Sequence, residues 1–209
     1  VNLNMIFPTR TQLVLICVSI LVNTALFIYS VDSTPYPDGP YLNATYHSAA
    51  DGQRYWGVAL NLIEKGEFSI PQLWDSRPDT PLARSGPLSP LIFALFIKLL
   101  GFDNAPLLIV IFQCMLLYVM SLLGRRLAVP FSSHKTLVQI LILFNPNLIG
   151  LAHHAQSDIV FAFIFTVILY LINRILIAPH NISRTSFLLL GGLTGLLCLT
   201  RHIGLMFSI

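Results

Sequence analysis

The chain has 209 residues, of which 55% are hydrophobic and only 10% are charged, and its mean hydropathy is +0.75. These values lie outside the range of soluble domains, and several apolar runs approach the roughly 20 residues that a helix needs to cross a bilayer. The formal net charge of +3 comes from basic residues spread over several connecting segments, a distribution that does not indicate a nucleic-acid-binding protein. We therefore predict an all-α, polytopic membrane protein, because a spanning β-barrel would alternate apolar and polar residues.

The three cysteines indicate neither a disulfide framework nor a zinc site. Cys17, Cys114 and Cys198 each lie inside an apolar run, and the sequence has no CxxC pair. We expect them to be small apolar residues, and we predict no metal site and no cofactor.

The first apolar run, Gln12 to Tyr29, follows Arg10 and predicts a spanning helix over about residues 12–30. The alternative is a secretory signal peptide, whose apolar core is usually about 7–15 residues long and ends at small residues. This run is longer and ends in large side chains, so we favour an uncleaved anchor.

A long polar stretch follows, from about Val31 to Pro87. Its first part is rich in Pro, Asp and Gly, which predicts turns. Apolar residues then recur at three- and four-residue spacing from Ser48 to Glu64, which predicts a helix that ends at Gly66. Charge on one side of this helix, with aromatic residues beside it, is typical of a helix in the membrane interface.

The 13-residue run Leu88–Leu100 is short for a crossing and favours an interfacial or re-entrant helix. If it does not cross, the later basic connectors fall on the same side as Arg10, as the positive-inside tendency requires. We therefore predict that the loop of about residues 31–104 lies outside the cytoplasm. The predicted spans are residues 12–30, 105–123, 136–152, 158–177 and 186–207, with the N-terminus inside. Because Ile209 ends the chain within an apolar run, we expect an N-terminal fragment of a larger protein.

Polar groups predicted at the outer face form a mixed set of acids, imidazoles and guanidinium groups. They are Asp51, Arg54, Tyr55, Asp75, Arg77, Arg84, His153, His154, Asp158, Arg201 and His202. Arginine binds phosphate, and a positioned carboxylate acts as a general base, so the set suits an anionic ligand together with a proton acceptor. It suits a metal less well, since the adjacent histidines would point apart on a helix.

Each of these residues also has a purely structural explanation. Asp51 follows Ser48 by three residues and could simply stabilise the start of a helix, a contribution of about 0.3–1 kcal/mol. Asp158 could be a first-turn carboxylate in the same way. Arg201 could extend its charged end to the interface, and the two histidines could be interfacial connectors. An ionisable group within a span is nevertheless a functional candidate by default.

The order of several segments resembles the dolichyl-phosphate-mannose protein mannosyltransferase and aminoarabinose transferase-like superfamily, whose members have the GT-C fold. The segments that carry the resemblance are Asp51–Leu62 with Gly66-Glu67-Phe68, Arg84–Gly101, Leu123–Leu127, Asn145-Pro146-Asn147 with Ser157-Asp158, and Gly191–Gly204. The chain departs from the family where Gly52 replaces a second acid found in some subgroups, and where Ser85-Gly86-Pro87 replaces paired prolines.

The resemblance implies a single transmembrane glycosyltransferase domain that transfers a sugar from a polyprenyl-phosphate donor to a lipid, glycan or protein acceptor. The reaction would be inverting and would occur at the outer face of a bacterial or archaeal plasma membrane. Asp51 would be the general base, and Asp158 would line the same cavity. Arg84 or Arg201 would contact the phosphate, and Arg54, Tyr55 and His154 would complete the substrate site.

Two other classes of function stay open. A transporter would place ionisable groups near the membrane midplane on broken helices, often in two repeated halves, and no internal repeat is visible here. A non-catalytic assembly subunit would tolerate neutralisation of Asp51.

Overall fold

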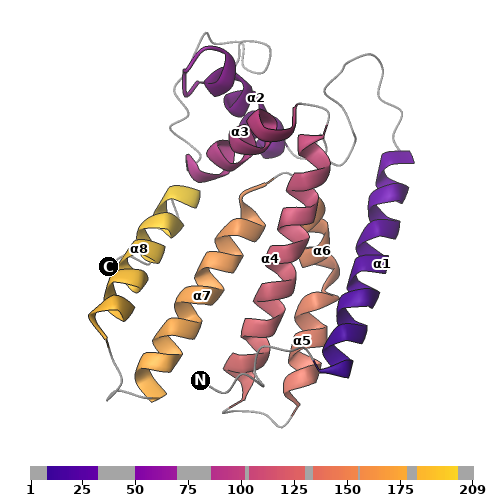
Figure 1. The fold of residues 1–209 in the computed structure, drawn as a ribbon, viewed down its shortest axis with the longest axis vertical. Helices are drawn as coiled ribbons and strands as arrows, with labels where there is room; N and C mark the ends of the chain where they lie inside the picture. Colours follow the sequence, from indigo (N-terminus) through magenta and orange to yellow (C-terminus); the bar gives the residue numbers. More distant parts are fainter. Residues whose placement is uncertain are drawn as a thin grey trace.

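The structure is a computed structural model that describes residues 9–32, 50–69, 86–101, 104–129, 134–154, 156–177 and 183–201. This part of the chain forms eight helices, which confirms the predicted all-α class for the described residues (Figure 1). The helices are α1 (Arg10–Asp32), α2 (Ala50–Glu64), α3 (Leu88–Leu100), α4 (Ala105–Ala128), α5 (Lys135–Leu143), α6 (Pro146–His153), α7 (Asp158–Ile177) and α8 (Arg184–Thr200).

Three helices, α1, α4 and α7, are long and apolar enough to cross a membrane. The pair α5 and α6 would add a fourth crossing if the two helices, bent by 45° at their junction, form one span. The remaining apolar helices, α3 and α8, are shorter, with 13 and 17 residues. The described residues therefore have the composition of a membrane-associated helical bundle.

The break between α5 and α6 has a local cause. Pro146 has no backbone N–H to continue the helix, and the side chain of Asn145 accepts hydrogen bonds from the backbone N–H groups of Asn147 and Leu148, at 2.9 and 3.2 Å. The break divides the region of the predicted span 136–152 into a nine-residue and an eight-residue helix.

Helix α4 is the centre of the bundle and packs against α3, α5, α6 and α7. Its buried residues recur at three- and four-residue intervals, from Ile109 through Gln113, Leu117 and Met120 to Gly124. This spacing places them on one side of the helix. Gly124 allows a close approach to α5, because a Cβ there would collide with the side chain of Ile142.

Helices α2 and α3 pack against each other and lie across the upper end of the bundle in Figure 1; we call them the upper layer. The helix predicted from Ser48 to Glu64 corresponds to α2, and Gly66, with a φ of 71°, follows its end as expected. Phe93 of α3 is buried against Tyr55 and Trp56 of α2, with ring centroids 6.4 and 6.0 Å apart. Aromatic packing thus holds the upper layer together.

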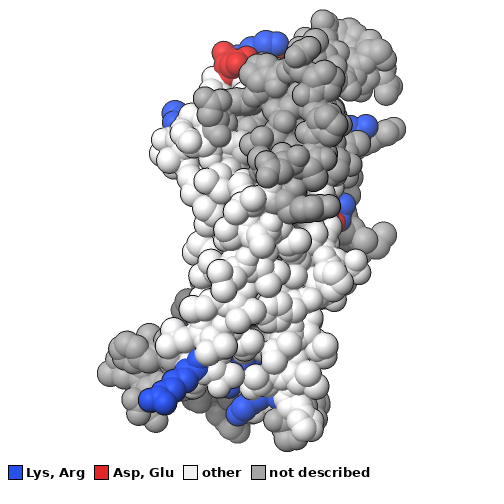
Figure 2. Space-filling model, turned by 90° about the vertical axis from the view of Figure 1, so that its right-hand side faces the viewer, with Lys and Arg blue, Asp and Glu red and all other residues white. Residues whose placement is uncertain are grey.

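Charged residues gather at the two ends of the bundle, and the upper end carries both basic and acidic side chains (Figure 2). The ends of helices that meet at the lower end carry only basic side chains, namely Arg10, Arg125, Arg126, Lys135, Arg174 and Arg184. The acidic side chains that the structure describes, Glu64, Glu67 and Asp158, belong to the upper end. The positive-inside tendency therefore predicts a cytoplasmic lower end and an external upper layer.

This orientation can be tested by cysteine labelling in a variant whose three native cysteines are replaced. A membrane-impermeant maleimide added to intact cells should label Glu67→Cys, which is exposed beyond α2, and should leave Lys135→Cys unlabelled until the cells are opened. Labelling of both positions, or only of Lys135→Cys, in intact cells would contradict the predicted topology.

Candidate functional site

Two residues separated by 43 positions form an ion pair where α7 begins and α8 ends. Asp158 is the first residue of α7, and Arg201 directly follows the last residue of α8. A guanidinium Nη1 of Arg201 donates a hydrogen bond to the Asp158 carboxylate. The positive end of the α7 dipole also stabilises the negative charge of the Asp158 carboxylate. The pair is partly accessible, with 37% of the Arg201 and 24% of the Asp158 side chain exposed, so a ligand can reach it.

The upper layer reaches the same place through Tyr55. The hydroxyl of Tyr55 on α2 is hydrogen bonded to the hydroxyl of Ser157, at 3.0 Å, and both side chains are buried. Ser157 immediately precedes Asp158, so this bond fixes α2 against the start of α7. We refer to Tyr55, Ser157, Asp158 and Arg201 as the polar site.

Helix α4 supports the segment that carries the polar site. Gln113, fully buried in the middle of an apolar helix, donates from Nε2 to the backbone carbonyl of Gln156, at 3.0 Å. Its Oε1 has no hydrogen-bond partner among the described residues. A buried amide in a spanning helix is costly unless it is bonded, so the bond to Gln156 gives this side chain a structural purpose.

The start of α3 lies directly against the end of α8. Gly86 is buried, and a Cβ there would collide with the backbone carbonyl of Leu199, two residues before Arg201. The close approach therefore needs glycine at this position. It brings the upper layer to the guanidinium side of the ion pair, as the Tyr55 bond brings it to the carboxylate side.

The structure describes some of the other candidate residues and leaves several outside its described part. Asp51 belongs to the first turn of α2, four residues before Tyr55, and its side chain is outside the described part of the structure. Arg54 is exposed on α2, and His154 is a half-buried residue at the end of α6. Several candidates lie outside the described residues altogether: Asp75, Arg77, Arg84 and His202.

His153 is better explained as a structural residue than as a ligand for substrate. It is 6% exposed, and its two ring nitrogens lie 2.9 and 3.2 Å from the backbone carbonyls of Ile149 and Asn23. The ring thereby connects α6 to α1. The sequence suggested an interfacial connector; the imidazole is instead buried between two helices.

The sequence analysis gives no role to Ser157, a member of the polar site, or to Gln113, which supports the segment that carries the site. The signal for Gln113 was present, since an amide in a 24-residue apolar helix needs a partner. No local sequence pattern indicates the role of Ser157, because its hydrogen-bond partner, Tyr55, is 102 residues away.

The geometry provides an accessible guanidinium for an anion, a carboxylate that orients it, and a pair of hydroxyl groups at the start of the helix that carries the carboxylate. Among the described residues, no three side chains of the metal-binding types come together. Comparison of the chain with protein-family models, curated proteins and solved structures gave no match.

The bond between Tyr55 and Ser157 can be measured by a double-mutant cycle on the purified protein. Tyr55→Phe and Ser157→Ala should each lower the free energy of unfolding, because each change removes one hydroxyl and leaves the other buried without this partner. The coupling free energy between the two substitutions should be about 0.5–1.5 kcal/mol. Tyr170→Phe is the matched control, because the described residues give its hydroxyl no hydrogen bond. A coupling near zero would mean that the hydroxyls do not interact.

Proposed function

We propose that the chain is part of a membrane glycosyltransferase that transfers a sugar from a polyprenyl-phosphate carrier to an acceptor hydroxyl at the external face. The observation that carries the proposal is the convergence of α2, α7 and α8 at the polar site. This convergence places the helix that contains Asp51 beside the accessible Arg201–Asp158 pair.

The reaction needs two functions from the protein. A carboxylate removes the proton of the acceptor hydroxyl while the oxygen of that hydroxyl attacks the anomeric carbon of the sugar. The bond from the anomeric carbon to the phosphate oxygen then breaks. The carrier leaves as a polyprenyl phosphate that takes up the bonding electron pair, so a cation beside the phosphate stabilises the charge that develops. Attack from the face opposite the phosphate inverts the anomeric configuration.

We assign the base to Asp51 and the phosphate contact to Arg201. Asp51 lies one helical turn before Tyr55, whose hydroxyl is bonded to the residue preceding Asp158. Arg201 is partly exposed and has further N–H donors besides the Nη1 that bonds Asp158. Asp158, with an oxygen already bonded to Arg201, serves to position the guanidinium in this proposal rather than to accept the hydroxyl proton.

The break between α5 and α6 gives little support to the alternative that the protein is a transporter. In transporters, the free backbone groups of a break bind the substrate or ion. Here the side chain of Asn145 already accepts from two of the N–H groups at the start of α6. The break therefore has a local explanation that requires no ligand.

Asp51→Asn tests the assignment of the base. The variant keeps the size of the side chain and most of its ability to stabilise a helix start. We expect a folded protein that still binds donor but transfers sugar about 10²–10⁴-fold more slowly. The control is Glu64→Gln at the exposed far end of α2, which should transfer normally. Transfer by Asp51→Asn within a few-fold of wild type would remove Asp51 from the mechanism.

Arg201→Gln tests the phosphate contact. A charge-assisted hydrogen bond is about twice as strong as a neutral one, so its loss should weaken binding of a polyprenyl-phosphate sugar by about 10-fold or more. Lys98→Gln removes an exposed charge from α3 and should leave donor binding unchanged. Binding is measured by titration with the same lipid in nanodiscs. Equal weakening by both substitutions would indicate a general surface-charge effect and contradict the assignment.

A further inference from the structure

The lower end of the bundle carries positive charge without acidic neighbours in the sequence. All nine acidic residues lie between Asp32 and Asp103 or at Asp158, and the connecting segments 130–133 and 178–182 contain none. The basic side chains at the lower end therefore have no acidic partner in their own helix ends or connectors. We call them the lower-end cations: Arg10, Arg125, Arg126, Lys135, Arg174 and Arg184.

Arg125 differs from the other lower-end cations in its surroundings. It is half-buried, whereas the others are exposed. Its Nη1 donates a hydrogen bond to Oε1 of Gln139, at 3.2 Å, and the Gln139 side chain is fully buried on α5. One residue before Arg125, the missing Cβ of Gly124 lets Ile142 of α5 approach closely. The guanidinium therefore has a defined position between α4 and α5.

The hydrogen-bond donors around Arg125 outnumber the acceptors. A guanidinium has several N–H donors, and Oε1 of Gln139 is the acceptor that the described residues give it. Nε2 of Gln139 is buried and has no hydrogen-bond partner in the described part of the chain. Lys135 lies one turn before Gln139, on the same side of α5, at the positive end of the helix dipole. This set of donors lacks an acceptor, and an anion would supply one.

The height of the donor set in the bundle favours a lipid over a dissolved anion. Helix α4 has the length and composition of a membrane span. Its 24 residues extend about 36 Å, which is longer than the roughly 30 Å of a hydrocarbon core. Arg125 belongs to the last turn of α4, and Lys135 is the first residue of α5. Both residues therefore lie close to the level of phospholipid phosphates.

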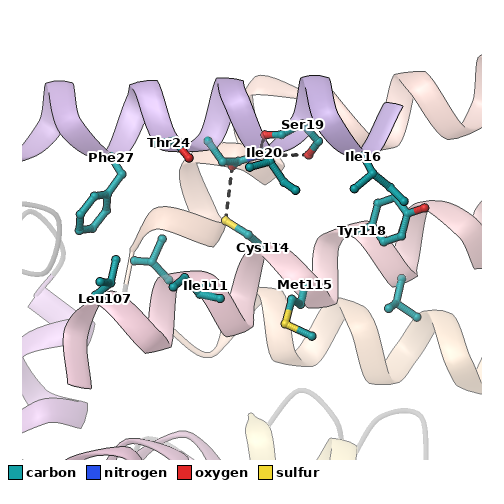
Figure 3. Close-up of a pocket in the computed structure, with 13 residues that line it drawn as sticks. Ile16, Ser19, Ile20, Thr24, Phe27, Leu107, Ile111, Cys114, Met115 and Tyr118 are labelled. Atoms are coloured by element: carbon teal, nitrogen blue, oxygen red, sulfur yellow. Dashed lines mark hydrogen bonds between the residues drawn. The ribbon is translucent and has the colours of Figure 1, made fainter. Parts of the chain in front are cut away.

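Arg125 also lies on a side of α4 that is open to the membrane. Cys114 and Tyr118 face α1 in Figure 3, and Arg125 follows Tyr118 by seven residues, which returns it to the same side of the helix. A groove separates α4 from α1 on this side, and Met115, which lines it, is 62% exposed. A phospholipid beside α4 can therefore bring its headgroup to the guanidinium.

We propose that the phosphate of an anionic phospholipid, from the leaflet at the lower end, binds between the last turn of α4 and the first turn of α5. Arg125 donates to the phosphate oxygens with N–H groups that Gln139 does not use, and Lys135 adds a second positive charge. A zwitterionic headgroup carries a cation of its own, which the lower-end cations repel. This site lies at the opposite end of the bundle from the polar site and is independent of the proposed transferase activity.

Substitution of two adjacent arginines tests the proposal on the purified chain. Native mass spectrometry measures the binding of phosphatidylglycerol and of phosphatidylcholine with the same acyl chains. Wild type should prefer phosphatidylglycerol, and Arg125→Gln should weaken its binding about 10-fold. Arg126→Gln, which removes an exposed charge at the same height, should change it only slightly. Equal weakening by the two substitutions, or equal binding of the two lipids by wild type, would overturn the proposal.

Gln139→Glu gives a second test in which the charge of Arg125 is kept. The carboxylate supplies the guanidinium with the anionic acceptor that it lacks, so the variant should bind phosphatidylglycerol about 10-fold more weakly than wild type. Binding equal to that of wild type would contradict the proposal. Either substitution alone decides the question if the other protein does not fold.

Competition with inorganic phosphate separates a lipid from a dissolved anion. Excess inorganic phosphate, added at constant ionic strength, should leave phosphatidylglycerol bound to wild type, because the lipid is held at the membrane surface beside Arg125. Displacement of the lipid would identify a dissolved anion as the ligand and would overturn the assignment to a phospholipid.

Discussion

The hydrocarbon core of a bilayer offers no water to bond a backbone N–H or carbonyl group, and this constraint determines where the protein can place chemistry. Within the helices, backbone groups bond to one another, so most side chains along α4 and α7 only need to be apolar. Helix ends are different, because their last N–H and carbonyl groups are free and dipole charge accumulates there. The ion pair between Asp158 and Arg201 lies at two such ends.

The polar site is built at the ends of two antiparallel helices. Because α7 and α8 run in opposite directions, the start of one lies beside the end of the other (Figure 1). A carboxylate at a helix start and a guanidinium at a helix end are each favoured by the dipole of their own helix. Tyr55 then adds a hydroxyl from α2. The polar site can therefore form without charging the middle of the bundle.

Much of the fold was predictable because it follows from local composition and periodicity. The start of α4 at Ala105, the extent of α7 from Asp158 to Ile177 and the stop of α2 near Gly66 could all be read from the sequence. The partners within the site could not. Asp158 and Arg201 were both named as candidates, but nothing in a sequence indicates that residues 43 positions apart bond to each other. The same limit concealed Ser157 and the buried position of His153, whose contacts are all set by helix packing.

The contact at Gly86 has a mechanical consequence. Most contacts between helices involve side chains, which can rotate and so absorb small displacements. At Gly86 the main chain that leads into α3 touches the main chain of α8 near Leu199, with no rotamer between them to absorb a shift. A displacement of the start of α3 toward α8 therefore pushes directly on the main chain of α8. Such a displacement would act on the main chain next to Arg201, whose guanidinium is bonded to α7.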